Sequence, residues 1–228
     1  MNIIKYKDYR WRFDEEVAEK FDEHVRQSVC MYDEFQKNIV KMSKFFIDNN
    51  SNILDVGTST GELLSRMKDE RFNCNWVGID TELAMVNKAK KKLGEGFKIE
   101  NADILNYKVD NCSVITMMLV LQFIKDKEKQ IAINNIYNSL NKGGAFFFVD
   151  KIKVKVSSIN DLYNDIYYDF KIEKGLTFEE IIKKNKSLRG IQKTITLEEN
   201  IALFKNAGFE NIDIFQKYNN FVGILAIK

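Results

Sequence analysis

The sequence has only one histidine, and this scarcity excludes several kinds of catalysis. His24 lies in a highly charged segment with no nucleophile motif nearby. Ser-His-Asp or Cys-His catalysis would have to use this residue, so we set both classes aside. The three cysteines, Cys30, Cys74 and Cys112, are an odd number and include no C-x-x-C pair. We therefore expect no disulfide framework and no metal site, and interpret the cysteines as reduced thiols of the core.

Proline and long apolar runs are also missing. The absence of proline, together with many Asn, Lys and Ile residues, is interpreted as compositional bias. No apolar run approaches the roughly 20 residues that a membrane span requires, and the N-terminus lacks the apolar region of a signal peptide. We expect a cytoplasmic protein with no membrane partner. The net charge of +2, from 35 Lys and Arg against 33 Asp and Glu, does not favour direct binding of nucleic acid.

The length of 228 residues and the 45% hydrophobic content suffice for one sizeable core. We expect a single domain over residues 1–228. Within it we distinguish an N-terminal helical lid (1–50), a ligand-binding core (51–150), a helical insertion (151–195), and a C-terminal helix with strands (196–228).

The segment N-I-L-D-V-G-T-S-T-G at Asn52–Gly61 is the most informative motif. An apolar run that ends at Asp55-Val56-Gly57 predicts a buried strand followed by a tight turn and a helix. Gly57 and Gly61 remove side chains where the backbone must pass close to a ligand, and residues 58–60 are candidate helix caps. The turn lacks the G-x-G-x-x-G pattern of dinucleotide-binding proteins. It therefore predicts a cradle for a different nucleoside ligand.

Two further acidic positions follow the next strands. Asp80 ends the strand W-V-G-I-D, where its carboxylate could accept two hydrogen bonds from a ribose diol. Asp103, in N-A-D-I, could bind the exocyclic amine of adenine while Ile104 lies against the base. Taken alone, Asp103 has the character of a solvated loop residue; its position relative to Gly57 and Asp80 favours a ligand contact.

The order of elements predicts the fold class. Strands are expected at 53–56, 75–79, 97–101, 113–119 and 145–150, alternating with helices at 62–69, 82–93 and 127–140. Further helices are expected at 157–170, 178–185 and 197–207, before strands at 211–218 and 220–227. This alternation predicts an α/β, doubly wound, Rossmann-like sheet that is mostly parallel, with an antiparallel C-terminal strand pair and N-terminal helices. The segment Lys142-Gly143-Gly144 is interpreted as a helix C-cap and turn.

Two helical regions have open interpretations. Phe13, Val17, Phe21 and Val25 are spaced as on an amphipathic helix, which either packs on the sheet edge or forms a lid with Arg26 and Tyr32 over the ligand. A second amphipathic helix is expected at 34–49. In the insertion, Tyr163, Tyr167 and Tyr168 either line a substrate or pack in the core.

The turn, its spacing to Asp80 and the acid itself resemble the class I S-adenosyl-L-methionine (SAM) methyltransferases. The closest resemblance is to the carboxy-S-adenosyl-L-methionine (carboxy-SAM) synthases. The motifs that carry it are W-R-F-D-E-E-V-A-E-K-F-D-E-H-V-R-Q-S-V-C-M-Y, D-V-G-T-S-T-G, G-I-D-T-E-L-A-M, N-A-D-I, L-V-L-Q-F-I and Y-Y-D-F-K. Those enzymes have the class I methyltransferase fold and make carboxy-SAM from SAM and prephenate for a tRNA wobble-uridine modification.

The resemblance implies SAM or carboxy-SAM as the ligand, a small-molecule substrate and a homodimer, for which 157–195 is our candidate contact surface. The expected ligand-binding residues are Tyr32, Asp55, Gly57, Thr58, Ser59, Gly61, Asp80, Thr81, Asp103, Ile104 and Met118. Candidates for binding the substrate are Arg26, Lys186 and Arg189. Candidates for a catalytic base are Tyr32, Tyr167 and Tyr168.

Two departures bear on the activity. Met118 stands where the family has Asn, and Lys184-Asn185-Lys186-Ser187 stands where the family has Lys-Arg for the extra carboxylate. A buried carboxylate needs a paired cation. Unless Arg189 or Lys186 substitutes, we expect a preference for SAM, and hence a methyltransferase acting on a small acceptor. Carboxy-SAM synthesis is the alternative, and a non-catalytic SAM-binding partner subunit is a third.

Overall fold

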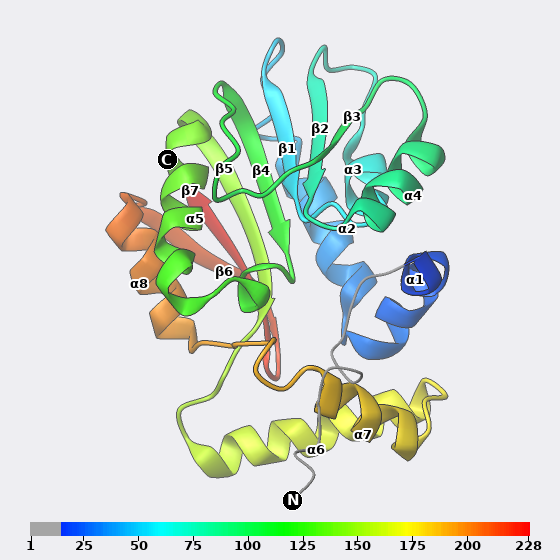
Figure 1. The fold of residues 1–228 in the computed structure, drawn as a ribbon. Coiled ribbons are helices and arrows are strands. Elements are labelled where there is room, and N and C mark those ends of the chain that lie inside the picture. Colours follow the sequence, from blue (N-terminus) through cyan, green and yellow to red (C-terminus); the bar gives the residue numbers. More distant parts are fainter. Residues whose placement is uncertain (1–14) are drawn as a thin grey trace, which may run out of the picture.

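The computed structural model describes residues 15–228 and shows a seven-stranded sheet between two layers of helices (Figure 1). The strand order is β3-β2-β1-β4-β5-β7-β6. Strands β1 to β5 pair in parallel, whereas β7 is antiparallel to both β5 and β6. The order reverses direction between β1 and β4, as in doubly wound sheets. The predicted fold class is confirmed; Phe13 and the side chain of Val17 lie outside what the structure describes.

The strands are β1 (Asn52–Val56), β2 (Asn75–Asp80), β3 (Lys98–Asn101), β4 (Cys112–Met118), β5 (Leu140–Lys151), β6 (Asn211–Tyr218) and β7 (Phe221–Ile227). The helices before the insertion are α1 (Glu15–Ser28), α2 (Tyr32–Ser43), α3 (Glu62–Met67), α4 (Leu83–Leu93), the 3-10 turn η2 (Leu121–Phe123) and α5 (Asp126–Ser139). The later helices are α6 (Ser157–Glu173), α7 (Phe178–Ser187) and α8 (Leu197–Ala207).

The central strands are buried on both faces because helices cover each side. Successive side chains of a strand point to opposite faces, so Phe146 and Phe148 pack on one side and Phe147 on the other. Helices α5 and α8 cover the first face, and α2, α3 and α4 cover the second. This two-sided burial explains why the sequence of β5 is a continuous apolar run.

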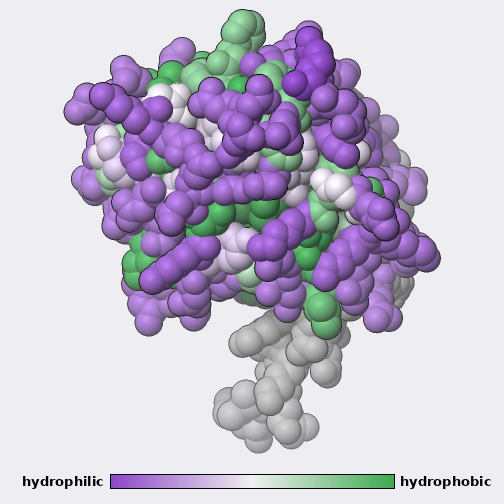
Figure 2. Space-filling model, turned by 90° about the horizontal axis from the view of Figure 1, so that it is seen from above, coloured by the Kyte–Doolittle hydropathy of each residue, from purple (hydrophilic) through white to green (hydrophobic). Residues whose placement is uncertain are grey.

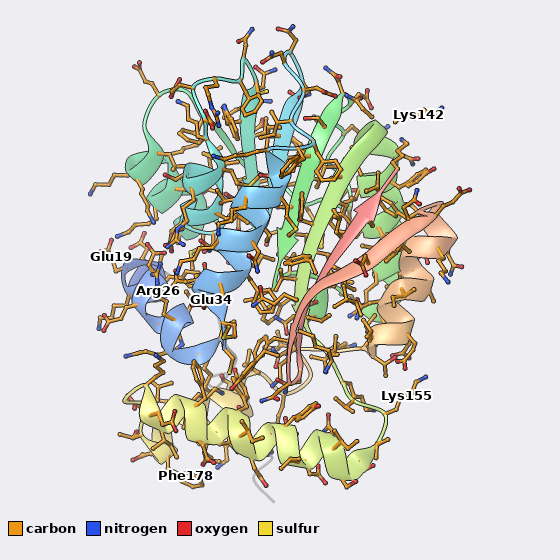
Figure 3. All side chains as sticks on the ribbon, turned by 180° about the vertical axis from the view of Figure 1, so that it is seen from behind. Glu19, Arg26, Glu34, Lys142, Lys155 and Phe178 are labelled. Atoms are coloured by element: carbon orange, nitrogen blue, oxygen red, sulfur yellow. The ribbon has the colours of Figure 1, made fainter. Side chains whose placement is uncertain are left out.

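The carboxyl ends of the parallel strands face α1, α6 and α7 (Figure 1). Figure 3 shows Arg26 on α1 toward this end of the molecule, and Lys142 near the amino end of β5 at the opposite end. The view from above onto that opposite end shows mainly hydrophilic residues with smaller apolar areas between them (Figure 2). The insertion therefore stands at the end of the sheet where ligands bind in such folds.

Two local predictions were wrong. The N-cap of α3 is Gly61 in the left-handed conformation with no side-chain cap, so residues 58–60 do not cap that helix. Lys142-Gly143-Gly144 is not a helix C-cap, because α5 ends at Ser139 and β5 begins at Leu140. The pairing of β4 with β5 shifts register next to this segment, between Cys112 and Val114, where Gly143 adopts a φ of 80°. Glycines with positive φ occur both at helix ends and at irregular starts of strands. This is why the two glycines of β5 were misassigned to a helix C-cap.

Candidate functional site

A cavity of about 670 Å³ lies at the carboxyl ends of β1, β2, β4 and β5. Its walls come from the turn after β1, the ends of β2 and β3, the 118–125 segment, helices α1 and α2, and the inner faces of α6 and α7. The size is typical of a site for a ligand such as a nucleoside. The described residues that line this cavity come from positions as far apart in the sequence as Phe21 and Phe221.

The turn after β1 brings backbone to the wall of the cavity. The backbone N–H groups of Gly57 and Thr58 both donate to the carbonyl of Ile79, at 2.8 and 2.9 Å. Gly57 has a φ of 71°, and a Cβ placed on it would lie 2.2 Å from Cγ2 of Val120. Both facts require glycine at this position. Ser59, also with positive φ, follows in the same turn and lines the cavity.

The carboxylate of Asp80 is held rigidly beside that turn. One oxygen accepts from the backbone N–H of Ser59 and the other from that of Glu82, both at 2.9 Å. Burial raises the pKa of Asp80 above its ordinary value, while the Glu82 and Ser59 N–H bonds oppose the rise. A carboxylate offers about four lone-pair sites. Asp80 therefore keeps acceptor capacity toward the cavity.

Asp103 and Ile104 line the same cavity after β3. Oδ1 of Asp103 accepts from the backbone N–H of Leu105 at 2.9 Å, which fixes the side chain. Ile104 is buried against the core. The structure therefore brings Asp103 into the same cavity as Gly57 and Asp80. The spacing of these residues in the sequence could only suggest this arrangement.

Asp55 differs from the other acids of the cavity because it is fully enclosed. Its Oδ1 accepts from Oγ1 of Thr116 at 2.5 Å. Burial raises the pKa of Asp55 to about 6, and the hydrogen bond from Thr116 limits the rise. Met118, one strand further along, also lines the cavity.

Helices α1 and α2 close one side of the cavity through polar contacts with the turn after β1 and with α3. Arg26 forms ion pairs with Asp33 and Glu62, while Oδ1 of Asp22 accepts from Oγ1 of Thr60 at 2.5 Å. Tyr32 and Gln36 of α2 line the cavity, and Arg26 does not. Tyr32 therefore forms part of the cavity wall, and the ion pairs of Arg26 hold α1 to α2 and α3 beside it.

Two buried acceptor atoms at this side have no hydrogen-bond partner among the described residues. They are Oε1 of Gln36 and Oε2 of Glu62. Both residues line the cavity. Buried acceptors are normally satisfied, so this pair indicates a donor group on a ligand.

The other end of the cavity is cationic. Lys151 from the end of β5, Lys171 from α6 and Lys184 from α7 all line it, together with His24 of α1. Burial, together with the charges of Lys151 and Lys184, lowers the pKa of Lys171 to about 7. Burial also lowers the pKa of both Lys151 and Lys184 to about 8. The pKa of His24 falls to about 4 through burial and the two α6–α7 lysines, which leaves the ring neutral at pH 7.

The cavity includes most of the ligand-binding residues that the sequence predicts. Those that line it are Tyr32, Asp55, Gly57, Thr58, Ser59, Asp80, Thr81, Asp103, Ile104 and Met118. Gly61 is not part of its wall, although the neighbouring Thr60 and Glu62 are.

Lys186 and Arg189, predicted to bind the substrate, lie outside the cavity and are exposed. The reason is the rotation of α7, which buries Ile181 and turns Lys184, Asn185 and Leu188 inward at the i+3, i+4 and i+7 positions. That periodicity was a usable signal for Lys184. Lys171 follows Tyr167 at i+4 and therefore shares its face, a second signal that the sequence contained.

Two of the tyrosines proposed as bases, Tyr32 and Tyr167, are protonated at neutral pH. Burial raises the pKa of Tyr32 and of Tyr167 far above the ordinary value. Tyr167 also donates from its hydroxyl to the carbonyl of Ser28 at 2.5 Å. Tyr168 is not part of the wall, and its hydroxyl accepts from Asn185 at 3.1 Å. The phenols of Tyr32 and Tyr167 can donate hydrogen bonds but are poor general bases.

Within residues 15–228, no three His, Cys, Asp or Glu side chains are placed so that they could hold a metal ion. None of the helices in that range has the length and apolar character that crossing a bilayer requires.

Comparison with known proteins agrees with this geometry. Residues 53–144 match a family model described as a methyltransferase domain. Human N-acetylserotonin methyltransferase in complex with SAM has a similar structure, with a TM-score of 0.64 at 15% identity over 94% of this chain and 56% of that one. The YcgJ protein of Bacillus subtilis gives 0.61 at 14% identity over 86% and 99%. The fold and the domain match define a class I SAM-dependent transferase, an enzyme for which SAM is the cofactor or substrate.

Two curated relatives identify the family more closely. The carboxy-S-adenosyl-L-methionine synthase of Staphylococcus epidermidis is 41% identical over 99% of this chain and all of its own length. The synthase of Nautilia profundicola is 34% identical over 96% of this chain and 95% of its own. The chain belongs to the carboxy-S-adenosyl-L-methionine synthase family.

Proposed function

We propose that this chain converts SAM to carboxy-SAM. The observation that carries the proposal is one cavity with two chemically different ends: a nucleoside-type end at Gly57, Asp80 and Asp103, and a cationic end at Lys151 and Lys171. A methyl acceptor does not in itself require buried positive charge, whereas transfer of a carboxylate does.

The nucleoside end fits each part of SAM. Asp80 has the acceptor capacity for the ribose hydroxyls, and Asp103 with Ile104 offers a polar and an apolar contact for adenine. The two unpartnered acceptors on Gln36 and Glu62 suit the ammonium group of the methionyl part. The turn at Gly57 leaves room for a ligand to approach the backbone.

The reaction sets the requirements on the protein. Converting SAM to carboxy-SAM replaces one C–H bond of the S-methyl group with a C–C bond to a carboxylate carbon. In the donor, prephenate, the C–C bond to the ring carboxylate and the C–O bond of the ring hydroxyl break as the ring becomes aromatic, and the methyl proton leaves with that hydroxide as water. The family donor, prephenate, carries two carboxylates. Residues of this chain would hold SAM at one end of the cavity and the anionic donor at the other, which is catalysis by proximity and orientation. The lid of α1 and α2 would exclude water from the cavity.

Methyl transfer to a small acceptor is the second candidate. It is favoured by Met118 and Asn185, which line the cavity at positions that differ from the family pattern. The expectation of a preference for SAM assumed that only Lys186 or Arg189 could supply the missing charge. Lys151, Lys171 and Lys184 supply it instead, which reverses our order of the two activities.

The test is incubation of the purified protein with SAM and prephenate, followed by mass spectrometry of the nucleosides. We expect a product that is heavier than SAM by the mass of CO2, because a carboxyl group replaces one hydrogen, and phenylpyruvate as the co-product. Formation of S-adenosylhomocysteine with a methylated small molecule would instead establish the methyltransferase and refute the synthase.

We also propose that the chain forms a homodimer through its insertion. Ile159, Leu162 and Ile172 of α6 are 39%, 53% and 50% exposed, which supports an apolar contact there. Light scattering coupled to size exclusion tests this, because replacing Leu162 with Glu should convert a dimer to a monomer. A monomeric parent protein would refute the proposal.

A further inference from the structure

Tyr167 forms the floor of the cationic end of the cavity. The Nζ atom of Lys171 lies 3.9 Å from the centroid of its ring, and Nζ of Lys151 lies 4.3 Å from it. Tyr167 in turn donates from its hydroxyl to the carbonyl of Ser28 and is 9% exposed. Two ammonium groups from different elements, β5 and α6, therefore meet at one fixed aromatic ring.

Neither ammonium group forms a hydrogen bond or an ion pair with any residue in the part of the chain that the structure describes. Lys171 is only 3% exposed, yet it lines the cavity. A ring face compensates a buried ammonium only in part. Two adjacent charges of the same sign, taken from water without a counter-charge, are unfavourable for folding. Such an arrangement indicates a ligand that supplies the missing negative charge.

The acids of the cavity do not neutralise this pair. Asp55, Asp80 and Asp103 serve the nucleoside end, where backbone N–H groups or Thr116 already occupy part of their lone pairs. Glu82 follows Asp80 at the same end, Glu62 is paired with Arg26 and Arg66, and Glu128 is paired with Lys125. The positive charge at Tyr167 thus has no counterpart among the carboxylates that line the cavity.

We propose that Lys151 and Lys171 form a carboxylate-binding site across the ring of Tyr167, which takes the place of an arginine in determining the specificity of this chain. The ligand is a small carboxylate. The identification of that carboxylate as prephenate or as the carboxyl group of carboxy-SAM rests on the proposed function. The site itself does not: it requires only that a small anion binds beside the nucleoside pocket.

The ring between the lysines adds a shape requirement. An apolar or unsaturated group of the ligand can pack against the part of Tyr167 that lines the cavity while its carboxylate reaches both ammonium groups. The ammonium group of lysine is a point charge on a flexible chain, whereas the guanidinium group of arginine is planar and binds a carboxylate in a fixed orientation. The site therefore selects the charge of the ligand more strongly than the orientation of its carboxylate. We expect tolerance of several carboxylates of similar size.

The experiment is calorimetric titration of three probes, namely SAM, carboxy-SAM and prephenate, into the parent protein and the K171M and K151M variants. The matched control is K174M, which removes an exposed lysine from the same end of α6. We expect K171M to weaken the binding of carboxy-SAM, prephenate or both by about 10- to 100-fold, as for the loss of a hydrogen bond between charged groups. SAM affinity should change less than about 2-fold, and K174M should match the parent.

The pattern of losses identifies the ligand. A loss for carboxy-SAM alone places the product carboxylate at the lysines, and a loss for prephenate alone places the donor there. Either supports the site, even if no carboxy-SAM is formed in the activity assay, a result that would refute only the proposed function. The proposed site would be overturned if K171M and K151M bound carboxy-SAM and prephenate as tightly as the parent protein. It would also be overturned if their affinity for SAM fell by the same factor as their affinity for the carboxylates.

Thermal unfolding distinguishes a binding role from a packing role. K171M removes a buried charge without a counterion, so its melting temperature should equal or exceed that of the parent. A melting temperature clearly below the parent, together with unaltered carboxylate affinity, would assign Lys171 to packing and refute the site.

Discussion

The carboxylate of Asp80 accepts a 2.9 Å hydrogen bond from the backbone N–H of Ser59, which joins the end of β2 to the turn after β1. The two halves of the nucleoside end are thereby fixed to each other before any ligand binds. Preorganisation of this kind reduces the cost of ordering the site on binding.

Replacing Asp80 with Ala should therefore weaken SAM binding. The change removes the proposed ribose acceptor and releases the N–H groups of Ser59 and Glu82. Loss of hydrogen bonds to a charged group costs about 1.5–3 kcal/mol, or about 10- to 150-fold in Kd. Calorimetry measures this, with E70Q, an exposed acid on the surface, as the control. An unchanged Kd in D80A would remove Asp80 from the site.

Replacing Gly57 with Ala should destabilise the protein through both conformation and contact. The φ of 71° costs an alanine about 1–2 kcal/mol, and the approach of the new Cβ to Val120 adds a steric cost of about 1–3 kcal/mol. Gly190 is the matched control, because its φ is 74° and a Cβ there would meet nothing within 4 Å. Urea unfolding should show a larger loss in G57A than in G190A, and V120A should recover part of it. Equal losses would show that the Val120 contact is unimportant.

The pKa shifts of the lysines predict a pH dependence of stability. Burial lowers the pKa of Lys171 to about 7 and of Lys151 to about 8 in the folded protein, against about 10.4 for an unfolded chain. Between these values the unfolded state binds more protons, so the free energy of unfolding should rise with pH from about 7 to about 10. Each lysine contributes at most about 1.4 kcal/mol per pH unit.

Other titratable groups face these lysines and must be separated from them. From α1, the following turn, α6 and α7 they are His24, Cys30, Tyr167, Tyr168 and Lys184. Comparison of the parent with K171M isolates Lys171, because the variant keeps the others. Urea unfolding of ligand-free protein at pH 7, 8 and 9 should give a smaller slope for K171M. Parallel slopes would show that Lys171 does not lose its proton in the folded state.

The fold of the sheet was predicted correctly, and the residues expected at the nucleoside end line one cavity, because both depend on local signals. A fully buried parallel strand is an uninterrupted apolar run, and the turn at Gly57 and the acid at Asp80 follow such runs directly. The cationic end depends on the packing of α6 and α7 against α1. Helical spacing places Lys171 on the face of Tyr167 and Lys184 on the face of Ile181, but it does not specify that these faces turn toward α1. In the sequence Y-Y-D-F-K, Lys171 has the character of a solvated helix residue; only tertiary structure buries it. Lys186 and Arg189 were predicted to bind the substrate without knowledge of how α7 is rotated about its axis. In the structure they lie on the side that points away from the cavity.

The last prediction concerns the lid. Arg26 of α1 pairs with Asp33 of α2 and with Glu62 of α3, and Arg66 pairs with the same two acids. An exposed ion pair contributes only about 0.2–1 kcal/mol, but Arg26 takes part in two and connects α1 to both neighbours. R26M should therefore open α1 more often, with amide hydrogen exchange in that helix faster by about 2- to 30-fold.

Hydrogen exchange followed by mass spectrometry measures this effect helix by helix. R71M is the control, because it removes an arginine whose ion pair with Asp69 lies away from α1. Exchange in α5, on the other face of the sheet, should be the same in all three proteins, since only local opening is affected. If R26M and the parent exchange α1 amides at equal rates, the contacts of Asp22 with Thr60 and Lys92 hold the lid without help from Arg26.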